Sequence, residues 1–185
     1  MIIQSKGYDL KFIQREPSND KSDHLFTLIY KFKSSKNKWN YILRAEYHKG
    51  DVFAVKFYAQ QHSKSDYKYS KITNNNDVIN ILVTTAKIIP LLLADYPEAS
   101  FGFTGARTLD EKSQKVENYE KNQRFRVYRN IITELIGNKT FTHYEYEQIS
   151  GYLLINNYFL KNITKKEKEL VDIFQTNYIN LPDIG

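Results

Sequence analysis

The 185-residue chain contains no cysteine, and it has only seven glycines, four prolines, one methionine and one tryptophan. Without cysteine it can build neither a disulfide framework nor a thiolate zinc site. This composition agrees with a cytoplasmic protein. The first six residues include no apolar core of the kind that signal peptides carry, so we expect no signal peptide.

Motifs of common active sites are also missing. The glycines are scattered, and the phosphate-binding patterns G-x-x-x-x-G-K and G-x-G-x-x-G do not occur. There is no G-x-S-x-G nucleophile elbow, and the four histidines show no metal-binding spacing. The sequence therefore indicates no catalytic residue, no cofactor and no metal.

The composition is that of a folded protein with a basic surface. A content of 41% hydrophobic and 15% aromatic residues excludes wholesale disorder. We expect a single domain over residues 1–160, followed by a C-terminal helix and tail over residues 161–185. The net charge is +6, and the basic excess lies in residues 1–50 and 105–130. Such a surface suits nucleic acid or another polyanion, with a protein partner as the alternative.

The chain is organised around an apolar run over residues 78–94, which predicts a buried helix. Asn76 or Asp77 is placed to cap its start. Pro90 lacks an N–H group and should kink or split the helix near Lys87. A membrane span needs about 20 mostly apolar residues. This run is shorter and includes Asn80, so we expect a core helix and no membrane partner.

The other segments predict an α+β fold with a mainly antiparallel sheet. Strands are expected over residues 8–13, over 24–33, 39–47 and 51–58 as an antiparallel meander, over 99–104, and over 141–147 and 152–156 as a hairpin. A second helix is expected over residues 119–136, ending at Gly137. A capping box at residues 164–167 predicts the start of a C-terminal helix. Residues 59–72 and 106–118 are expected to be surface loops.

Two basic groups are candidates for an anion or nucleic-acid site. In the first, Arg124 and Tyr128 share one helix face, and Arg126 falls on another. We expect Arg124 and Tyr128 to face the sheet near Gly102 and Gly105, where the missing side chains leave room for a guanidinium or a ligand. A guanidinium on an apolar stripe needs a partner. That partner is either a structural carboxylate or carbonyl, or a bound anion. In the second, basic and tyrosine residues alternate, as in surfaces that bind single-stranded nucleic acid. The full candidate set is Arg107, Arg124, Arg126, Tyr128, Arg129, Lys64, Tyr67, Lys68, Tyr69 and Lys71.

One stretch resembles an uncharacterised bacterial domain family common in Bacteroidetes. Its pattern runs T-N-N-x-D, an apolar helix with V-L-x-T-V, a proline before a strand, a G-S/T turn and R-x-R-L-Y. The matching residues are Thr73, Asn74, Asn75, Asp77, Ile81, Leu82, Thr84, Thr85, Pro97, Gly105, Arg124, Arg126, Val127 and Tyr128. The chain departs from the pattern by an insertion over residues 107–123 and by Val127 in place of leucine. The resemblance implies a fold but no activity.

A second resemblance concerns only the order of elements. Meander, helix, strand, helix and hairpin is similar to the later part of GNAT acetyltransferases, in which acetyl-CoA pyrophosphate sits on a glycine-containing loop before the central helix. The corresponding residues 59–77 contain no glycine, although close approach of backbone to a phosphate favours glycine.

We therefore expect a non-enzymatic binding module whose partner is nucleic acid or another anionic molecule. Three alternatives stay open: a degenerate GNAT-like acyltransferase, a small basic ribonuclease of the toxin type, and a protein–protein interaction module. The acyltransferase needs a phosphate-binding loop. The ribonuclease needs an acid and a base in one cleft, and the binding module needs only a basic face.

Overall fold

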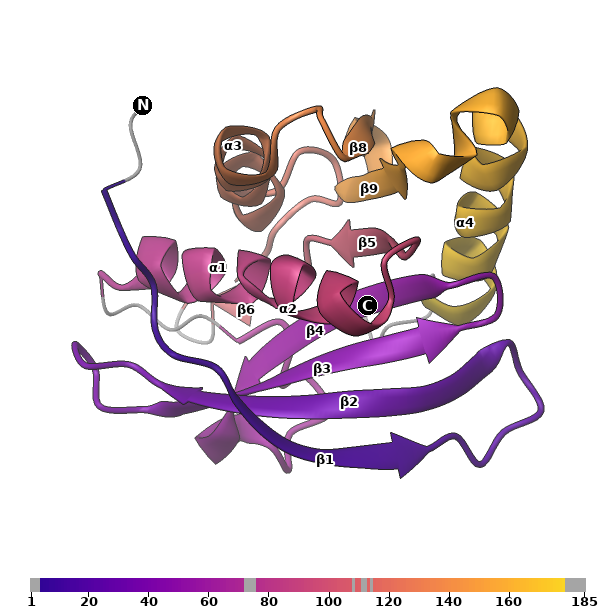
Figure 1. Ribbon diagram of the computed structural model, residues 1–185. Helices are drawn as coiled ribbons and strands as arrows, with labels where there is room; N and C mark the ends of the chain where they lie inside the picture. The colour runs from indigo at the N-terminus through magenta and orange to yellow at the C-terminus, as the bar shows by residue number, and fades with distance from the viewer. Residues whose placement is uncertain (1–3, 72–75, 108, 111–112, 114, 179–185) are drawn as a thin grey trace.

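Seven strands form one mixed sheet in a computed structural model of the chain, which describes residues 4–71, 76–107, 109–110, 113 and 115–178 (Figure 1). The order of the strands across the sheet is β1-β2-β3-β4-β5-β9-β8. Their bounds are β1 Lys11–Pro17, β2 His24–Lys33, β3 Asn40–His48, β4 Val52–Ala59, β5 Ser100–Thr104, β8 Phe141–Tyr146 and β9 Gly151–Asn156. The predicted meander is β2–β4, which β1 extends, and the predicted hairpin is β8–β9, so the α+β prediction is confirmed.

The pairing of β4 with β5 is parallel, whereas the other strand pairs of this sheet are antiparallel within the described residues. A parallel neighbour requires a crossover connection. Here the crossover carries the predicted central helix, which lies over one face of the sheet as α1 (Val78–Ala86) and α2 (Ile88–Asp95). The apolar run between β4 and β5 thus supplies the crossover helix that their parallel pairing requires.

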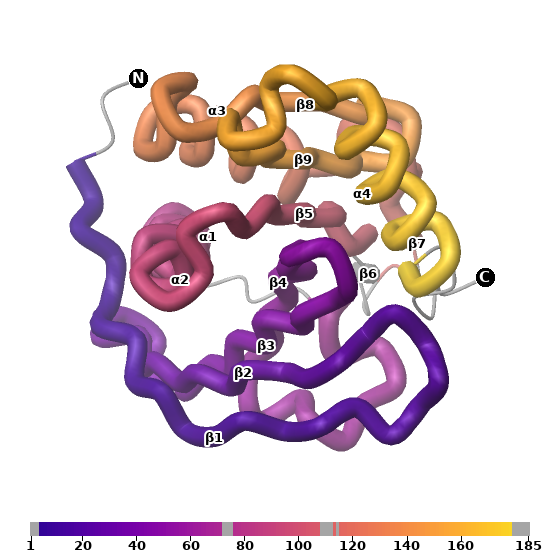
Figure 2. The backbone as a smooth tube through the Cα atoms, turned by 45° about the vertical axis from the view of Figure 1, so that its right-hand side comes forward, coloured from indigo at the N-terminus to yellow at the C-terminus, as the bar shows by residue number. Residues whose placement is uncertain are grey.

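Helices cover both faces of the sheet. On one face α1, α2 and α3 (Gln123–Ile136) bury the main core, in which Phe53, Phe101 and Ile132 are fully buried. On the opposite face α4 (Ile163–Tyr178) packs against Val52 and Ala54 of β4 and against β9. Figure 2 shows α1, α2 and α3 on one side of the strands and α4 on the other.

The central helix is divided as predicted, and one of its faces is buried in the core. Helix α1 ends at Ala86 and α2 begins at Ile88, because the ring of Pro90 conflicts with the carbonyl four residues earlier, which is that of Ala86. By length and composition the stretch Val78–Asp95 is apolar enough to cross a membrane, but half of it is buried inside the protein.

Asp77 occupies the predicted N-cap position of α1, but its side chain does not cap the helix. The carboxylate is 1% exposed and accepts hydrogen bonds from Tyr8 Oη at 2.8 Å, from Asn80 Nδ2 at 2.7 Å and from the Ser34 hydroxyl. A buried carboxylate needs several donors, and these three side chains supply them. Asp77 therefore fixes the N-terminal segment and the β2–β3 turn to the start of α1.

Several predicted boundaries were wrong. The first strand runs over Lys11–Pro17 rather than residues 8–13, because Tyr8 is bonded instead to α1, where its N–H donates to Thr84 Oγ1 at 2.7 Å. In the predicted 106–118 loop, β6 (Leu109–Asp110) pairs with β7 (Lys115–Val116), and residues 108, 111, 112 and 114 lie outside the described part of the chain. The predicted capping residue Thr164 falls inside α4, whose first residue is Ile163.

A glycine in β5 accounts for how closely α4 approaches the sheet. A Cβ atom on Gly102 would lie 1.9 Å from Cζ of Phe174 in α4, which no structure tolerates without movement. We expected the space beside Gly102 and Gly105 to hold a guanidinium or a ligand, and this expectation was wrong. Phe174 fills the first space, and the side chain of Asn122 fills the second.

We predict that Leu92→Asp unfolds the protein, whereas Leu91→Asp does not. Leu92 is 2% exposed and Leu91 is 48% exposed, although they are neighbours in α2. An unpaired carboxylate at Leu92 should lower the free energy of unfolding by more than about 4 kcal/mol. Thermal denaturation of both variants measures the difference. Equal melting temperatures would contradict a packing role for α2.

Candidate functional site

The candidate site lies where β4 and β5 separate. Their pairing extends only from Val52 with Ser100 to Ala54 with Gly102, although β4 continues to Ala59 and β5 to Thr104. In sheets with parallel strands, ligands bind at the carboxyl ends of strands whose connections diverge. Two cavities open at this point, and they share Tyr69 and residues 103–106 as walls.

The larger cavity, which we call the tyrosine cleft, has a volume of about 490 Å³. This volume is within the range of about 300–1,000 Å³ that is typical of small-molecule sites. Five tyrosines line the cleft: Tyr67, Tyr69, Tyr119, Tyr146 and Tyr178. They come from the 60–71 loop, the segment before α3, β8 and α4. The charged side chains in its wall are Asp66 and Arg107.

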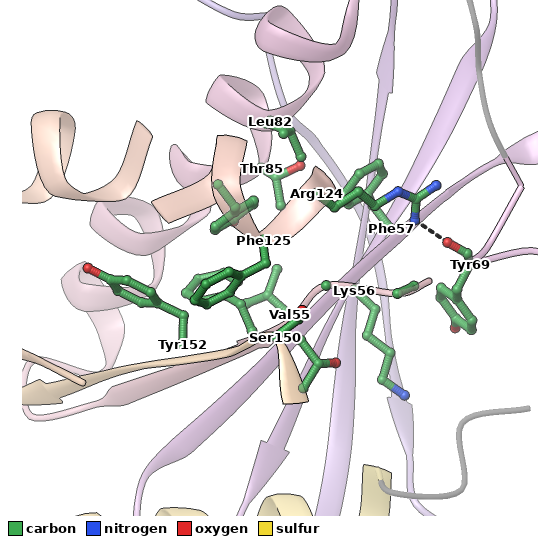
Figure 3. A pocket seen from close by; sticks show the side chains of 15 residues that line it. Val55, Lys56, Phe57, Tyr69, Leu82, Thr85, Arg124, Phe125, Ser150 and Tyr152 are labelled. Atoms are coloured by element: carbon green, nitrogen blue, oxygen red, sulfur yellow. Dashed lines mark hydrogen bonds between the residues drawn. The ribbon is translucent and has the colours of Figure 1, made fainter. Parts of the chain in front are cut away.

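The smaller cavity, which we call the inner cavity, has a volume of about 50 Å³ and lies against the start of α3. Its walls include Phe57 of β4, Thr85 of α1, and Arg124, Phe125 and Tyr128 of α3. Figure 3 labels Phe57, Thr85, Arg124 and Phe125 around the cavity and shows Arg124 extending to the backbone of Tyr69. Successive side chains of a strand point to opposite faces, so Phe57 faces Arg124 while Lys56 points the other way.

Arg124 joins α3 to the 60–71 loop. Its Nη1 donates to the carbonyl oxygen of Tyr69, and its Nη2 donates to that of Lys71 at 2.8 Å. The guanidinium also lies 5.8 Å from the ring centre of Phe57. Burial lowers the pKa of Arg124 to about 10, and the carboxylate of Glu117 offsets only part of this effect. The arginine therefore stays charged at neutral pH, and the carbonyls compensate its lost hydration.

The side chain of Asn122 starts α3 beside this site. It occupies the N-cap position, and its Oδ1 accepts from the Phe125 N–H at 2.9 Å. Its amide donates to the carbonyl of Gly105, and its N–H donates to Ser150 Oγ at 2.9 Å. Asn122 thus fixes the first turn of α3, including Arg124, against the end of β5.

A buried polar network lies beneath the tyrosine cleft. Tyr178 donates its hydroxyl proton to Glu46 Oε2 at 2.5 Å. The hydroxyl oxygen of Tyr178 lies 2.5 Å from His48 Nε2. Lys56 Nζ is 3.0 Å from Glu46 Oε2 and 4.5 Å from the ring centre of Tyr178. These contacts hold the last turn of α4, and therefore one wall of the cleft, against β3 and β4.

The pKa shifts in this network follow from burial and from the neighbouring charges. Burial lowers the pKa of His48 to about 4, with a further contribution from His24, so the ring is neutral at pH 7. Burial alone would raise the pKa of Glu46, but Lys56 and the Tyr178 hydroxyl lower it below its ordinary value. Glu46 is therefore ionised and accepts the proton of the Tyr178 hydroxyl. His48 is neutral and donates from Nε2 to the hydroxyl oxygen of Tyr178. Because His48 is fully buried, it cannot contact a phosphodiester as a catalytic base.

The structure gathers only part of the predicted site set. Tyr67, Tyr69 and Arg107 line the tyrosine cleft, and Arg124 and Tyr128 line the inner cavity. The guanidinium of Arg107 lies 3.9 Å from the ring centre of Tyr119. The ammonium of Lys68 lies 4.7 Å from the ring centre of Tyr58.

The remaining members of the set lie around or away from the two cavities. Lys64 is exposed on the 60–71 loop, and Lys71 contributes its carbonyl to Arg124. Arg126 is exposed. Arg129 lies 3.4 Å from Glu145 of β8 in an ion pair. Arg126 and Arg129 therefore do not belong to the candidate site.

Sequence reasoning missed the contribution of β3 and α4 to the site. The signal was available in β3, where Arg44, Glu46 and His48 occupy alternate positions of a strand with two neighbours. Charged groups on the buried face of an interior strand need partners.

Within the described residues, no group of three or more His, Asp or Glu side chains could hold a metal ion.

Comparison of the chain with protein-family models, with curated proteins and with solved structures gives no match. The similarity to the bacterial domain family and to the element order of GNAT acetyltransferases therefore stays a prediction. The site has to be interpreted from its own geometry.

We predict that Arg124→Ala lowers the free energy of unfolding by about 1–3 kcal/mol, because it leaves two loop carbonyls without their donor. Arg126→Ala, two residues away and exposed, should change it by less than about 0.5 kcal/mol. Chemical denaturation of both variants measures the two values. A loss as large for Arg126→Ala as for Arg124→Ala would show that the carbonyl contacts do not matter.

Proposed function

We propose that the protein is a non-enzymatic module that binds a nucleotide unit, either free or within single-stranded nucleic acid, in the tyrosine cleft. The observation that supports this most is the convergence of five tyrosines, from segments far apart in the sequence, on one cleft of about 490 Å³. Aromatic side chains stack on nucleobases with little sequence preference, each contributing about 1–3 kcal/mol.

The charges around the cleft favour an anionic ligand. Arg107 and Asp66 line the cleft, and Lys64 and Lys68 lie on the loop that forms one wall, so three cations stand against one carboxylate. Burial raises the pKa of Tyr69, so its hydroxyl is neutral at pH 7. Neutral rings with cations nearby suit a ligand that combines a flat base with a phosphate.

Acyl transfer is the second candidate, and one observation favours it. The inner cavity is lined by both of the parallel strands β4 and β5, and the order of elements is that of the GNAT resemblance. The glycine-free stretch before α1 argues against a pyrophosphate of acetyl-CoA at this position. Stabilisation by acetyl-CoA without stabilisation by nucleotides would favour acyl transfer. The ribonuclease alternative gains no support from His48, because this histidine is fully buried against Tyr178 and cannot reach a substrate.

We predict that a fluorescent single-stranded oligonucleotide binds the protein with an affinity that falls steeply as salt rises, because neutralised phosphates release counterions. Changing Lys64, Lys68 and Lys71 together to Gln should weaken binding and flatten the slope of log affinity against log salt by about 1–2. Fluorescence anisotropy measures both quantities.

A triple variant with the same net charge serves as the control. Lys11, Lys21 and Lys33 are exposed residues of β1, β2 and the loop between them, and their change to Gln should leave the slope nearly unchanged. Equal effects of the two triple variants would mean that only total charge matters. If neither oligonucleotides nor free nucleotides bind at low salt, the proposal is wrong and a protein partner takes its place.

A further inference from the structure

Tyr128 carries a polar atom that the fold leaves without a partner. The side chain is 8% exposed, and its hydroxyl has no hydrogen-bond partner among the described residues. A buried hydroxyl without a partner is costly, so native proteins rarely retain one. The ring lines the inner cavity, and its centre lies 4.7 Å from that of the Phe103 ring, with the two rings tilted by 39°. A phenylalanine would keep this packing and avoid the cost.

Arg124 lies one helical turn before Tyr128 and lines the same cavity. Its guanidinium has five N–H donors, of which the carbonyls of Tyr69 and Lys71 engage two nitrogen atoms. Within the part of the chain that the structure describes, no carboxylate forms a salt bridge with Arg124, although Glu117 is near enough to raise its pKa. The wall of the inner cavity thus combines a partly buried positive charge with a tyrosine whose hydroxyl lacks a partner.

The size of the inner cavity limits what it can hold. A cavity needs about 10–15 Å³ of this volume for each water-sized group, so 50 Å³ accommodates three to five heavy atoms. A carboxylate or a phosphoryl group has this size, whereas a nucleobase does not. A guanidinium and a hydroxyl are also the donors that an oxyanion accepts from.

We propose that the inner cavity is an oxyanion subsite, in which Tyr128 and Arg124 bind the phosphoryl or carboxylate end of the ligand whose flat part lies in the tyrosine cleft. The two cavities share Tyr69 and residues 103–106, so one ligand can reach both. The inference extends the proposed function, since it assigns the ligand's anionic group to a particular place. The phosphate of a nucleotide and free inorganic phosphate offer the same chemistry.

The experiment compares a nucleoside, its 5′-monophosphate and inorganic phosphate as probes of wild-type protein and Tyr128→Phe. Isothermal titration gives the dissociation constants and thermal denaturation gives the shift in melting temperature. Without any probe, Tyr128→Phe should melt at a higher temperature than wild type, because it removes an unsatisfied hydroxyl. Wild type should bind the monophosphate at least tenfold more tightly than the nucleoside. Tyr128→Phe should lose most of that preference and keep its affinity for the nucleoside.

Tyr8→Phe is the control for removal of a tyrosine hydroxyl elsewhere. The Tyr8 hydroxyl donates to buried Asp77, so its loss should lower the melting temperature and leave the monophosphate preference intact. An unchanged preference in Tyr128→Phe, or equal affinities of wild type for nucleoside and monophosphate, overturns the subsite. If neither nucleoside nor monophosphate binds but inorganic phosphate stabilises wild type and not Tyr128→Phe, the subsite stands and the nucleotide proposal fails.

Discussion

The site depends on the bonds between the guanidinium of Arg124 and the backbone carbonyls of Tyr69 and Lys71. The carbonyls of a loop need donors when they leave solvent, and a buried guanidinium needs acceptors, so each group satisfies the other. The bonds hold the 60–71 loop against α3 beyond the point where β4 and β5 separate. Tyr67 and Tyr69 therefore become a wall of the cleft, and the gap between the strands stays open as the inner cavity.

Features that arise from short-range chemistry could be predicted from the sequence. Strand β2 runs over the predicted residues because His24–Lys33 is rich in aromatic and β-branched residues and is bounded by polar turns. The division of the central helix follows from Pro90, and α3 ends before Gly137, which has a positive φ of 63°. The spacing of four residues placed Arg124 and Tyr128 on one face, and both line the inner cavity. Each of these depends on residues within one or two turns.

Features that depend on distant pairing could not be predicted. Tyr178 and Glu46 are 132 residues apart in the sequence. They meet because the side chain of Glu46 points to the face of the sheet that α4 covers. The space at Gly102 holds Phe174 rather than a guanidinium, since α4 packs closely on β5 there. Asp77 occupies a capping position, yet its carboxylate serves Tyr8 and Ser34. In each case the role of the residue depends on a contact with a residue that is distant in the sequence.

Mapping of a bound oligonucleotide by nuclear magnetic resonance tests the central claim most directly. Titration of a short single-stranded oligonucleotide into isotope-labelled protein should shift amide signals of the 60–71 loop, of residues 103–107 and of the second half of α4. The signals of β1 and β2 should stay in place, because no residue of these strands lines either cavity among those that the structure describes. Shifts confined to β1 and β2, or no shifts at all, would contradict the assignment of the tyrosine cleft as the binding site.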